Sequence, residues 1–211
     1  MFCAFEYRQT ALEKNQMMWY NLGKFSECKE RKIMEFQNVI ESRRSVRKYD
    51  GSKKVTKEQV ESVIAAAIEA PSWKNSQTAR YYCVMSEDMC KKVREECLPG
   101  FNCERSENAV LIVTAFVHNR AGFDREGNPD NEVGNGWGFY DLGLHNENLI
   151  LKAAELGLGT LVMGIRNGEK LRKVLQIPDT ETVVSVIAMG YPAESPQKPK
   201  RKTPADIAKF F

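Results

Sequence analysis

Hydrophobic and polar positions follow a pattern that predicts helices interleaved with strands from residue 34 onward. The first clear helix follows Thr56, because Thr56 and Gln59 match a capping box. We expect Pro71 to end this helix, since the residue before a proline avoids the helical region of backbone space. Its buried stripe recurs at i, i+3, i+4, i+7 and i+8 and comprises Val60, Val63, Ile64, Ala67 and Ile68.

Two segments, 108–117 and 182–189, are hydrophobic on both faces, which is typical of central strands covered by helices. The polar segment 118–138 predicts a long loop, and such loops are more often lids or binding loops than spacers. Gly157 is expected to end the longest helix. Shorter strands are predicted at 81–85 and 160–163, and helices at 87–98, 139–156 and 169–175.

The length of 211 residues fits a single domain, which we place at residues 34–211. Residues 1–33 show no sustained period, so we expect an N-terminal extension, either from an upstream translation start or as an added surface helix. A charged fraction of 28% with a net charge of +3 excludes a highly charged disordered chain. There is no run of 18 hydrophobic residues, so we expect no transmembrane helix and no membrane partner.

The six cysteines contain no C-x-x-C pair, and the two histidines are not spaced as zinc ligands, so we expect no metal site. The polar N-terminus lacks the hydrophobic core of a secretion signal. We therefore expect six reduced thiols and a cytoplasmic location.

Positive charge gathers at the two ends of the chain. Residues 1–60 hold 13 lysines and arginines against 8 acidic residues, and residues 191–211 hold 5 against 2. Two distant basic segments can converge on one anionic ligand, but they can equally be two solvated surfaces. The charge pattern alone leaves both readings open.

Arg43, Arg44 and Arg47 stand close together at the predicted end of a helix, beside Ser42 and Ser45. Guanidinium groups match the oxygens of a phosphate, although arginines at a helix end also complement the helix dipole. The run is short and lacks interleaved aromatic residues, so we expect no nucleic-acid partner.

The loop after Pro71 is rich in groups that both donate and accept hydrogen bonds, including Ser72, Asn75 and Gln77. Such groups suit the edge of a heterocycle, but they also cap loop backbones. The sequence Gly157-Leu158-Gly159 is no dinucleotide fingerprint, because it follows a helix and precedes a strand. No nucleophile or Walker motif is present, and we expect no catalytic side chain. Ligand-holding groups without an acid–base set suggest that a cofactor supplies the chemistry.

The chain contains, in this order, the segments 40–47 (IESRRSVR), 70–77 (APSWKNSQ), 141–143 (DLG), 148–154 (NLILKAA), 157–160 (GLGT), 174–178 (VLQIP), 190–192 (GYP) and the basic tail. With these segments the sequence resembles the FMN-dependent nitroreductase family over nearly all of residues 34–211. Each segment is weak alone, and the series in the family's order is specific.

The resemblance implies an α+β fold with a central, mainly antiparallel sheet flanked by helices, in an intertwined homodimer with FMN at the subunit interface. It further implies a ping-pong transfer of hydride from NADH or NADPH through flavin N5 to a small-molecule acceptor, a nitroaromatic or a quinone. The implied FMN-binding residues are Arg43, Arg44, Ser45, Arg47, Pro71, Ser72, Asn75, Gln77, Met163, Gly164, Ile165, Arg201 and Lys202.

One departure concerns the substrate. Many members continue Asn-x-Gln with Pro-Trp, whereas here Thr78 and Ala79 follow Gln77. The sequence therefore does not determine the residues of the pocket wall or the identity of the acceptor. A specialised flavin reaction of the same fold, such as dehalogenation or flavin fragmentation, and a non-catalytic FMN-binding protein stay as alternatives.

Overall fold

A four-stranded sheet lies at the centre of residues 35–211, the part of the chain that the computed structural model describes. The strand order is β1-β2-β4-β3, and every neighbouring pair is antiparallel. The expected α+β fold with an antiparallel sheet is thus confirmed. The predicted extension at residues 1–33 lies outside the described residues. The strands are β1 (Ala79–Val84), β2 (Val110–Val117), β3 (Gly159–Met163) and β4 (Glu181–Gly190).

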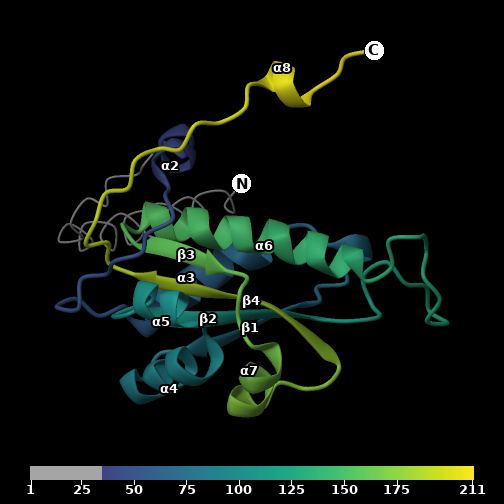
Figure 1. The fold of residues 1–211 in the computed structure, drawn as a ribbon. Helices are drawn as coiled ribbons and strands as arrows, with labels where there is room; N and C mark the ends of the chain where they lie inside the picture. Colours follow the sequence, from purple (N-terminus) through teal and green to yellow (C-terminus); the bar gives the residue numbers. More distant parts are fainter. Residues whose placement is uncertain (1–34) are drawn as a thin grey trace, which may run out of the picture. The chain divides into compact units, whose positions relative to one another are not determined.

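Helices cover both faces of the sheet, as Figure 1 shows for α3 and α6 on one side and α4 and α7 on the other. The first side holds α3 (Lys57–Ile68) and the 20-residue α6 (Gly136–Glu155), and the second holds α4 (Glu87–Cys97), α5 (Gly100–Arg105) and α7 (Gly168–Leu175). The short α2 (Phe36–Ser42), the 3₁₀ turn η2 (Trp73–Asn75) and α8 (Pro204–Ile207) complete the described elements.

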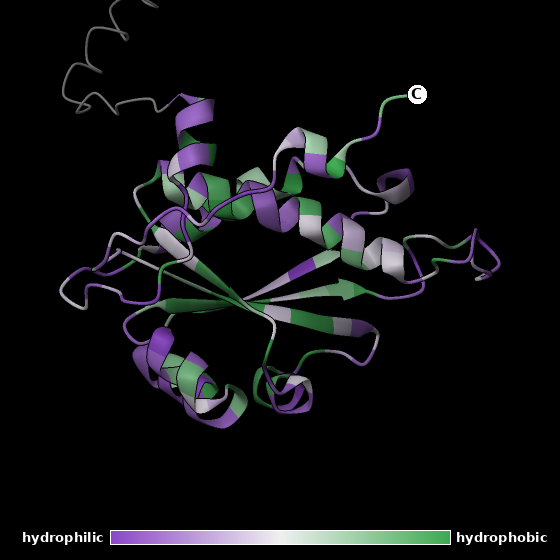
Figure 2. Ribbon diagram, turned by 45° about the horizontal axis from the view of Figure 1, so that its top comes forward, coloured by the Kyte–Doolittle hydropathy of each residue, from purple (hydrophilic) through white to green (hydrophobic). Residues whose placement is uncertain are grey.

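The central strand β2 contributes side chains to two hydrophobic cores, one on each face of the sheet, because successive side chains of a strand point to opposite faces. Val110 and Ile112 pack in the α3/α6 core, whereas Leu111 and Val113 pack in the α4/α7 core. Figure 2 shows the strands mostly in the hydrophobic colour and the outer loops mostly in the hydrophilic one. The two-faced hydrophobic run of the sequence is therefore explained by two separate cores.

The capping box that predicted α3 is present, with Thr56 Oγ1 accepting from the Gln59 N–H and Gln59 Oε1 from the Thr56 N–H. One detail of the prediction is wrong, since Ile68 is 62% exposed rather than part of the buried stripe. The helix ends at Ile68, before Pro71, as expected.

Helix α6 begins at Gly136, three residues earlier than the sequence predicts, and α5 was not predicted at all. Glycines disfavour helices, which is why the run before residue 139 reads as a loop. Gly138 is needed there because a Cβ atom would lie 2.3 Å from the ring of Phe116. The close packing of α6 against the sheet at Phe116 therefore outweighs the low helix propensity of these glycines.

The segment after α2 runs along the start of β3 and beside the chain that leaves β4. Ser45 forms a parallel bridge with Thr160, and the Val46 N–H donates to the Thr160 carbonyl at 2.9 Å. Tyr49 bridges Pro192 in the antiparallel sense. The arginine run and the start of the C-terminal tail are therefore both attached to one end of the sheet.

Candidate functional site

The arginine run occupies the turn directly after α2, as predicted. Arg44 donates to the Glu41 and Arg43 carbonyls, both at 2.7 Å, so it caps the end of the helix. Arg47 donates from its side chain to the Ser45 carbonyl at 3.1 Å. Among residues 35–211, none of the three guanidinium groups of this run lies within 4.0 Å of a carboxylate. The side chains of the run are therefore cations that form no ion pair with the described residues.

A pocket of about 210 Å³ lies against this run. Its wall combines Arg43 and Arg44 with the turn from α6 to β3 and with the start of the tail after β4. Gly157, with φ +75°, makes that turn in the left-handed conformation expected of it. Gly159 lies in β3, where a Cβ would stand 2.7 Å from Val46 Cγ2. Because Gly159 has no side chain, the segment that follows the arginines can pack against β3.

Strand β3 leads from this pocket to Met163, Gly164 and Ile165. Thr160 and Gly164 are separated by about 13 Å at ~3.3 Å per residue of extended chain. Gly164 and Ile165 are exposed, whereas the Met163 side chain is buried and offers only its backbone. The edge of β3 therefore connects the cationic pocket to an exposed backbone segment.

This exposed segment is held in place from the other side. The Asn102 amide donates to the Ile165 carbonyl at 2.9 Å, and the Asn167 N–H donates to the Cys97 carbonyl at 2.7 Å. Arg166 donates to the Val183 carbonyl of β4. Three contacts to two helices and a strand fix the backbone at residues 164–167.

The loop from Pro71 to Gln77 is ordered by its own polar groups and by α6. The Gln77 N–H donates to Ser72 Oγ at 3.1 Å, and Gln77 Nε2 donates to Asn75 Oδ1 at 3.2 Å. Lys74, Asn75 and Gln77 all have positive φ, a conformation that costs energy outside glycine. The structure thus brings Ser72, Asn75 and Gln77 together at one exposed turn and strains the backbone to do so.

Asp141 of α6 anchors this loop. Its Oδ2 accepts the Trp73 N–H at 2.8 Å, and the side chain is buried. Burial raises the pKa of Asp141, while the Trp73 hydrogen bond and His145 oppose that shift. His145 itself is buried with Nδ1 2.8 Å from the Asp141 carbonyl, in keeping with a structural role rather than that of a base.

The first turn of α6 contacts the same turn through an aromatic side chain, and the 118–135 loop contacts it through a charged one. The rings of Trp73 and Trp137 lie 4.4 Å apart, centroid to centroid, and Lys74 pairs with Asp130 at 2.8 Å. Trp73 Nε1 also donates to Asp130 at 3.2 Å. These contacts were not predicted from the sequence, because the partners are more than 50 residues apart.

Arg201 and Lys202 are exposed on the tail, which runs without regular structure from residue 193 to α8. Figure 1 shows this tail leading away from the sheet toward the C-terminus. Within residues 35–211, no hydrogen bond or ion pair joins either side chain to the arginine run. One chain alone brings the start of the tail, but not Arg201, to the pocket.

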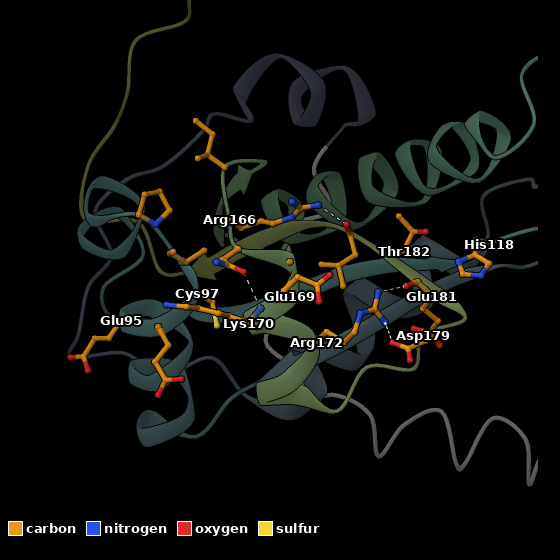
Figure 3. A pocket seen from close by; sticks show the side chains of 17 residues that line it. Glu95, Cys97, His118, Arg166, Glu169, Lys170, Arg172, Asp179, Glu181 and Thr182 are labelled. Atoms are coloured by element: carbon orange, nitrogen blue, oxygen red, sulfur yellow. Dashed lines mark hydrogen bonds and ion pairs between the residues drawn. The ribbon is translucent and has the colours of Figure 1, made fainter.

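A larger cavity of about 880 Å³ opens between α4, α7 and β4, and the sequence did not reveal it (Figure 3). Arg172 and Glu181 of its lining make the following polar contacts. Arg172 donates to the Glu181 carbonyl at 2.7 Å and pairs with Asp179 at 3.7 Å, and Glu181 accepts from Tyr82 at 2.7 Å. Burial and this contact raise the pKa of Tyr82 to about 12.

Three further findings hold for residues 35–211. Their four cysteines, at positions 83, 90, 97 and 103, form no disulfide, whereas Cys3 and Cys28 lie outside the described residues. In that range no group of three or more His, Cys, Asp or Glu side chains is placed to hold a metal ion. The described helices include none with the length and hydrophobicity needed to span a membrane.

A sequence model described as the nitroreductase family matches residues 40–191. The chain belongs to the nitroreductase family. This confirms the prediction made from the arginine run, the loop after Pro71 and the segments that follow them.

Relatives of this nitroreductase-family chain are similar over most of their length. A putative NADH dehydrogenase/NAD(P)H nitroreductase of Archaeoglobus fulgidus is 28% identical, covering 76% of this chain and 87% of the relative. An FMN reductase [NAD(P)H] of Bacillus subtilis is 30% identical over 74% of this chain and 66% of its own. A solved nitroreductase family protein of Clostridium novyi NT, 26% identical, aligns with a TM-score of 0.64 over 79% of this chain and 89% of that one.

The residues of this family member fit the cofactor FMN. A flavin phosphate needs cations and backbone donors, and the guanidinium groups of Arg43 and Arg44 in this pocket form no ion pair within 4.0 Å among the described residues. The Arg47 N–H already binds a carboxylate oxygen, that of Glu194, at 2.6 Å, so the turn accepts anions. The exposed edge at Gly164 and Ile165 follows β3, which starts at that pocket.

Proposed function

We propose that this chain is an FMN-dependent oxidoreductase that passes hydride from NAD(P)H to nitroaromatic or quinone acceptors, with donor and acceptor using one site in turn. Its class, an NAD(P)H-dependent oxidoreductase with FMN, follows from the family and from relatives such as the NAD(P)H nitroreductase and the FMN reductase. The acceptor and the ping-pong order are the proposal. The observation that supports it best is the cationic pocket at one end of an exposed strand edge.

At the phosphate end, Arg43, Arg44, Ser45 and Arg47 would hold FMN. Arg43 has its guanidinium group available, and Arg44 keeps donors beyond the Nη1 that caps α2. Their fixed positive charge favours a dianion over a neutral ligand. The pocket therefore selects a flavin that carries a phosphate.

At the ring end, the backbone of Met163, Gly164 and Ile165 would lie along the flavin, and Ser72, Asn75 and Gln77 would approach its polar edge together with Pro71. When bound, FMN supplies the centre that takes hydride from one substrate and gives it to the next. The contribution of the chain is a backbone already fixed by Asn102 and Cys97, since donors that need no reorganisation stabilise developing charge best.

The site is proposed to be completed by a second copy of the chain. Large hydrophobic residues at the tail end are highly exposed, with Ile207 at 74% and Phe210 at 90%. On the domain itself Ile68 and Tyr140 are 62% and 60% exposed. A homodimer would cover these side chains and would bring Arg201 and Lys202 to the phosphate of an FMN at the subunit interface.

The test is the spectrum and turnover of the purified protein. We expect a yellow dimer that oxidises NADH or NADPH in the presence of nitrofurazone or menadione. Double-reciprocal plots at several acceptor concentrations should give parallel lines, which ping-pong kinetics require. A yellow protein without turnover would instead favour a specialised flavin reaction or a non-catalytic flavoprotein, and a colourless one that binds no FMN would refute the proposal.

A further inference from the structure

Glu194 stands within the cationic pocket, although nothing in the sequence marks it as part of a site. It lies just after β4, where the Asp50 N–H donates to the Tyr191 carbonyl and the Ala193 N–H to the Lys48 carbonyl, both at 2.9 Å. These contacts hold the segment against the arginine run. The pocket wall includes Glu194 together with Arg43 and Arg44.

The carboxylate of Glu194 binds the loop backbone rather than an arginine side chain. Its Oε1 accepts the Arg47 N–H at 2.6 Å, a short distance typical of a charged acceptor. No ion pair within 4.0 Å joins it to a guanidinium group of the described residues. A negative charge thus sits in a pocket otherwise suited to anions, without neutralising its cations.

We propose that Glu194 competes with the flavin phosphate and thereby lowers the affinity for FMN. This inference rests on the proposed function, since it concerns the same pocket. The carboxylate takes the Arg47 N–H that a phosphate oxygen would use, and its charge opposes a ligand that carries about −1.5 to −2 at neutral pH. Ligands without a phosphate do not meet this opposition.

Two substitutions separate the charge from the hydrogen bond. Glu194→Gln keeps an oxygen that accepts the Arg47 N–H but removes the charge, and Glu194→Ala removes both. Glu41→Gln is the matched control. Glu41 is exposed on α2 next to the run, its carboxylate accepts from the Gln37 side chain, and it is not part of the pocket wall.

The measurement is the dissociation constant of each purified protein, stripped of flavin and titrated with FMN or with riboflavin, which lacks the phosphate. We expect both Glu194 variants to bind FMN about three- to tenfold more tightly than the unmodified protein, as expected for removing one partly solvated charge near a dianion. Riboflavin affinity should stay the same in all proteins, and Glu41→Gln should bind FMN as the unmodified protein does.

Several results of this titration would overturn the inference on Glu194. Equal FMN affinity in Glu194→Gln and the unmodified protein, or weaker binding in Glu194→Ala, would show that Glu194 only anchors the tail, and would overturn the inference while leaving the proposed function intact. Tighter binding of riboflavin as well would also overturn it, because the effect would not depend on the phosphate. If no protein binds FMN, both the proposed function and the role of Glu194 are wrong.

Discussion

Replacing Gly159 by alanine should displace the arginine run, because this glycine is what lets the run lie against β3. An added Cβ would stand 2.7 Å from Val46 Cγ2, 2.9 Å from Val46 Cβ and 3.1 Å from Val46 Cγ1. Val46 is buried, with an exposed fraction of 4%, so it has no free space to move into. The segment carrying Ser45 and Val46 must shift away from Thr160.

Overpacking of this kind costs about 1–3 kcal/mol. At about 2–4 °C per kcal/mol for a chain of this size, the melting temperature should fall by roughly 2–12 °C. The bridge between Ser45 and Thr160 would also open, so FMN affinity should fall by about tenfold, or 1.4 kcal/mol.

Thermal unfolding followed by circular dichroism and fluorescence titration with FMN measure the two effects. Gly143→Ala is the control, since a Cβ there meets nothing within 4 Å; alanine within α6 should stabilise the protein by about 0.5–1 kcal/mol. Adding Val46→Ala to Gly159→Ala removes two of the three clashing atoms and should restore part of the loss. A Gly159→Ala protein with unchanged melting temperature and FMN affinity would refute this reasoning.

Two further predictions concern buried polar groups of the loop region. Because burial raises the pKa of Asp141, the folded chain holds a proton that the unfolded chain releases, so the free energy of unfolding should fall as pH rises from the ordinary Asp pKa through the raised one. Asp141→Asn should abolish this fall in denaturant titrations between about pH 4 and 7. An unchanged dependence on pH in the variant would contradict the assignment. Thr78 Oγ1 is buried with no hydrogen-bond partner among the described residues. Thr78→Val should therefore leave the free energy of unfolding unchanged or raise it by up to about 1 kcal/mol. A clear decrease in denaturant unfolding would show that the hydroxyl has a partner.

The sequence predicted the elements whose signals are local. The capping box at Thr56 and the two-faced strands need only neighbouring residues to be recognised, and they are present. The arginine run and the loop after Pro71 were recognised from residue types in order, and the structure places them in the turn after α2 and in the loop that contains η2.

Features that depend on distant contacts were not predicted. Gly138 joins α6 only because Phe116 packs against it, and the Trp73–Trp137 contact joins segments far apart in sequence. Glu194 belongs to no motif and enters the pocket because the chain after β4 returns beside Arg47. The position of Arg201 beside FMN remains a prediction, because the tail of one chain leads away from that chain's own pocket.

The central claim is that the guanidinium groups after α2 bind the phosphate of FMN, and comparing Arg43→Ala with Arg94→Ala tests it most directly. Arg94 lies on α4, away from the pocket beside Arg43. After identical purification, we predict that Arg43→Ala retains far less FMN per chain than the unmodified protein, while Arg94→Ala retains the same amount. Equal FMN content in all three proteins would contradict the claim.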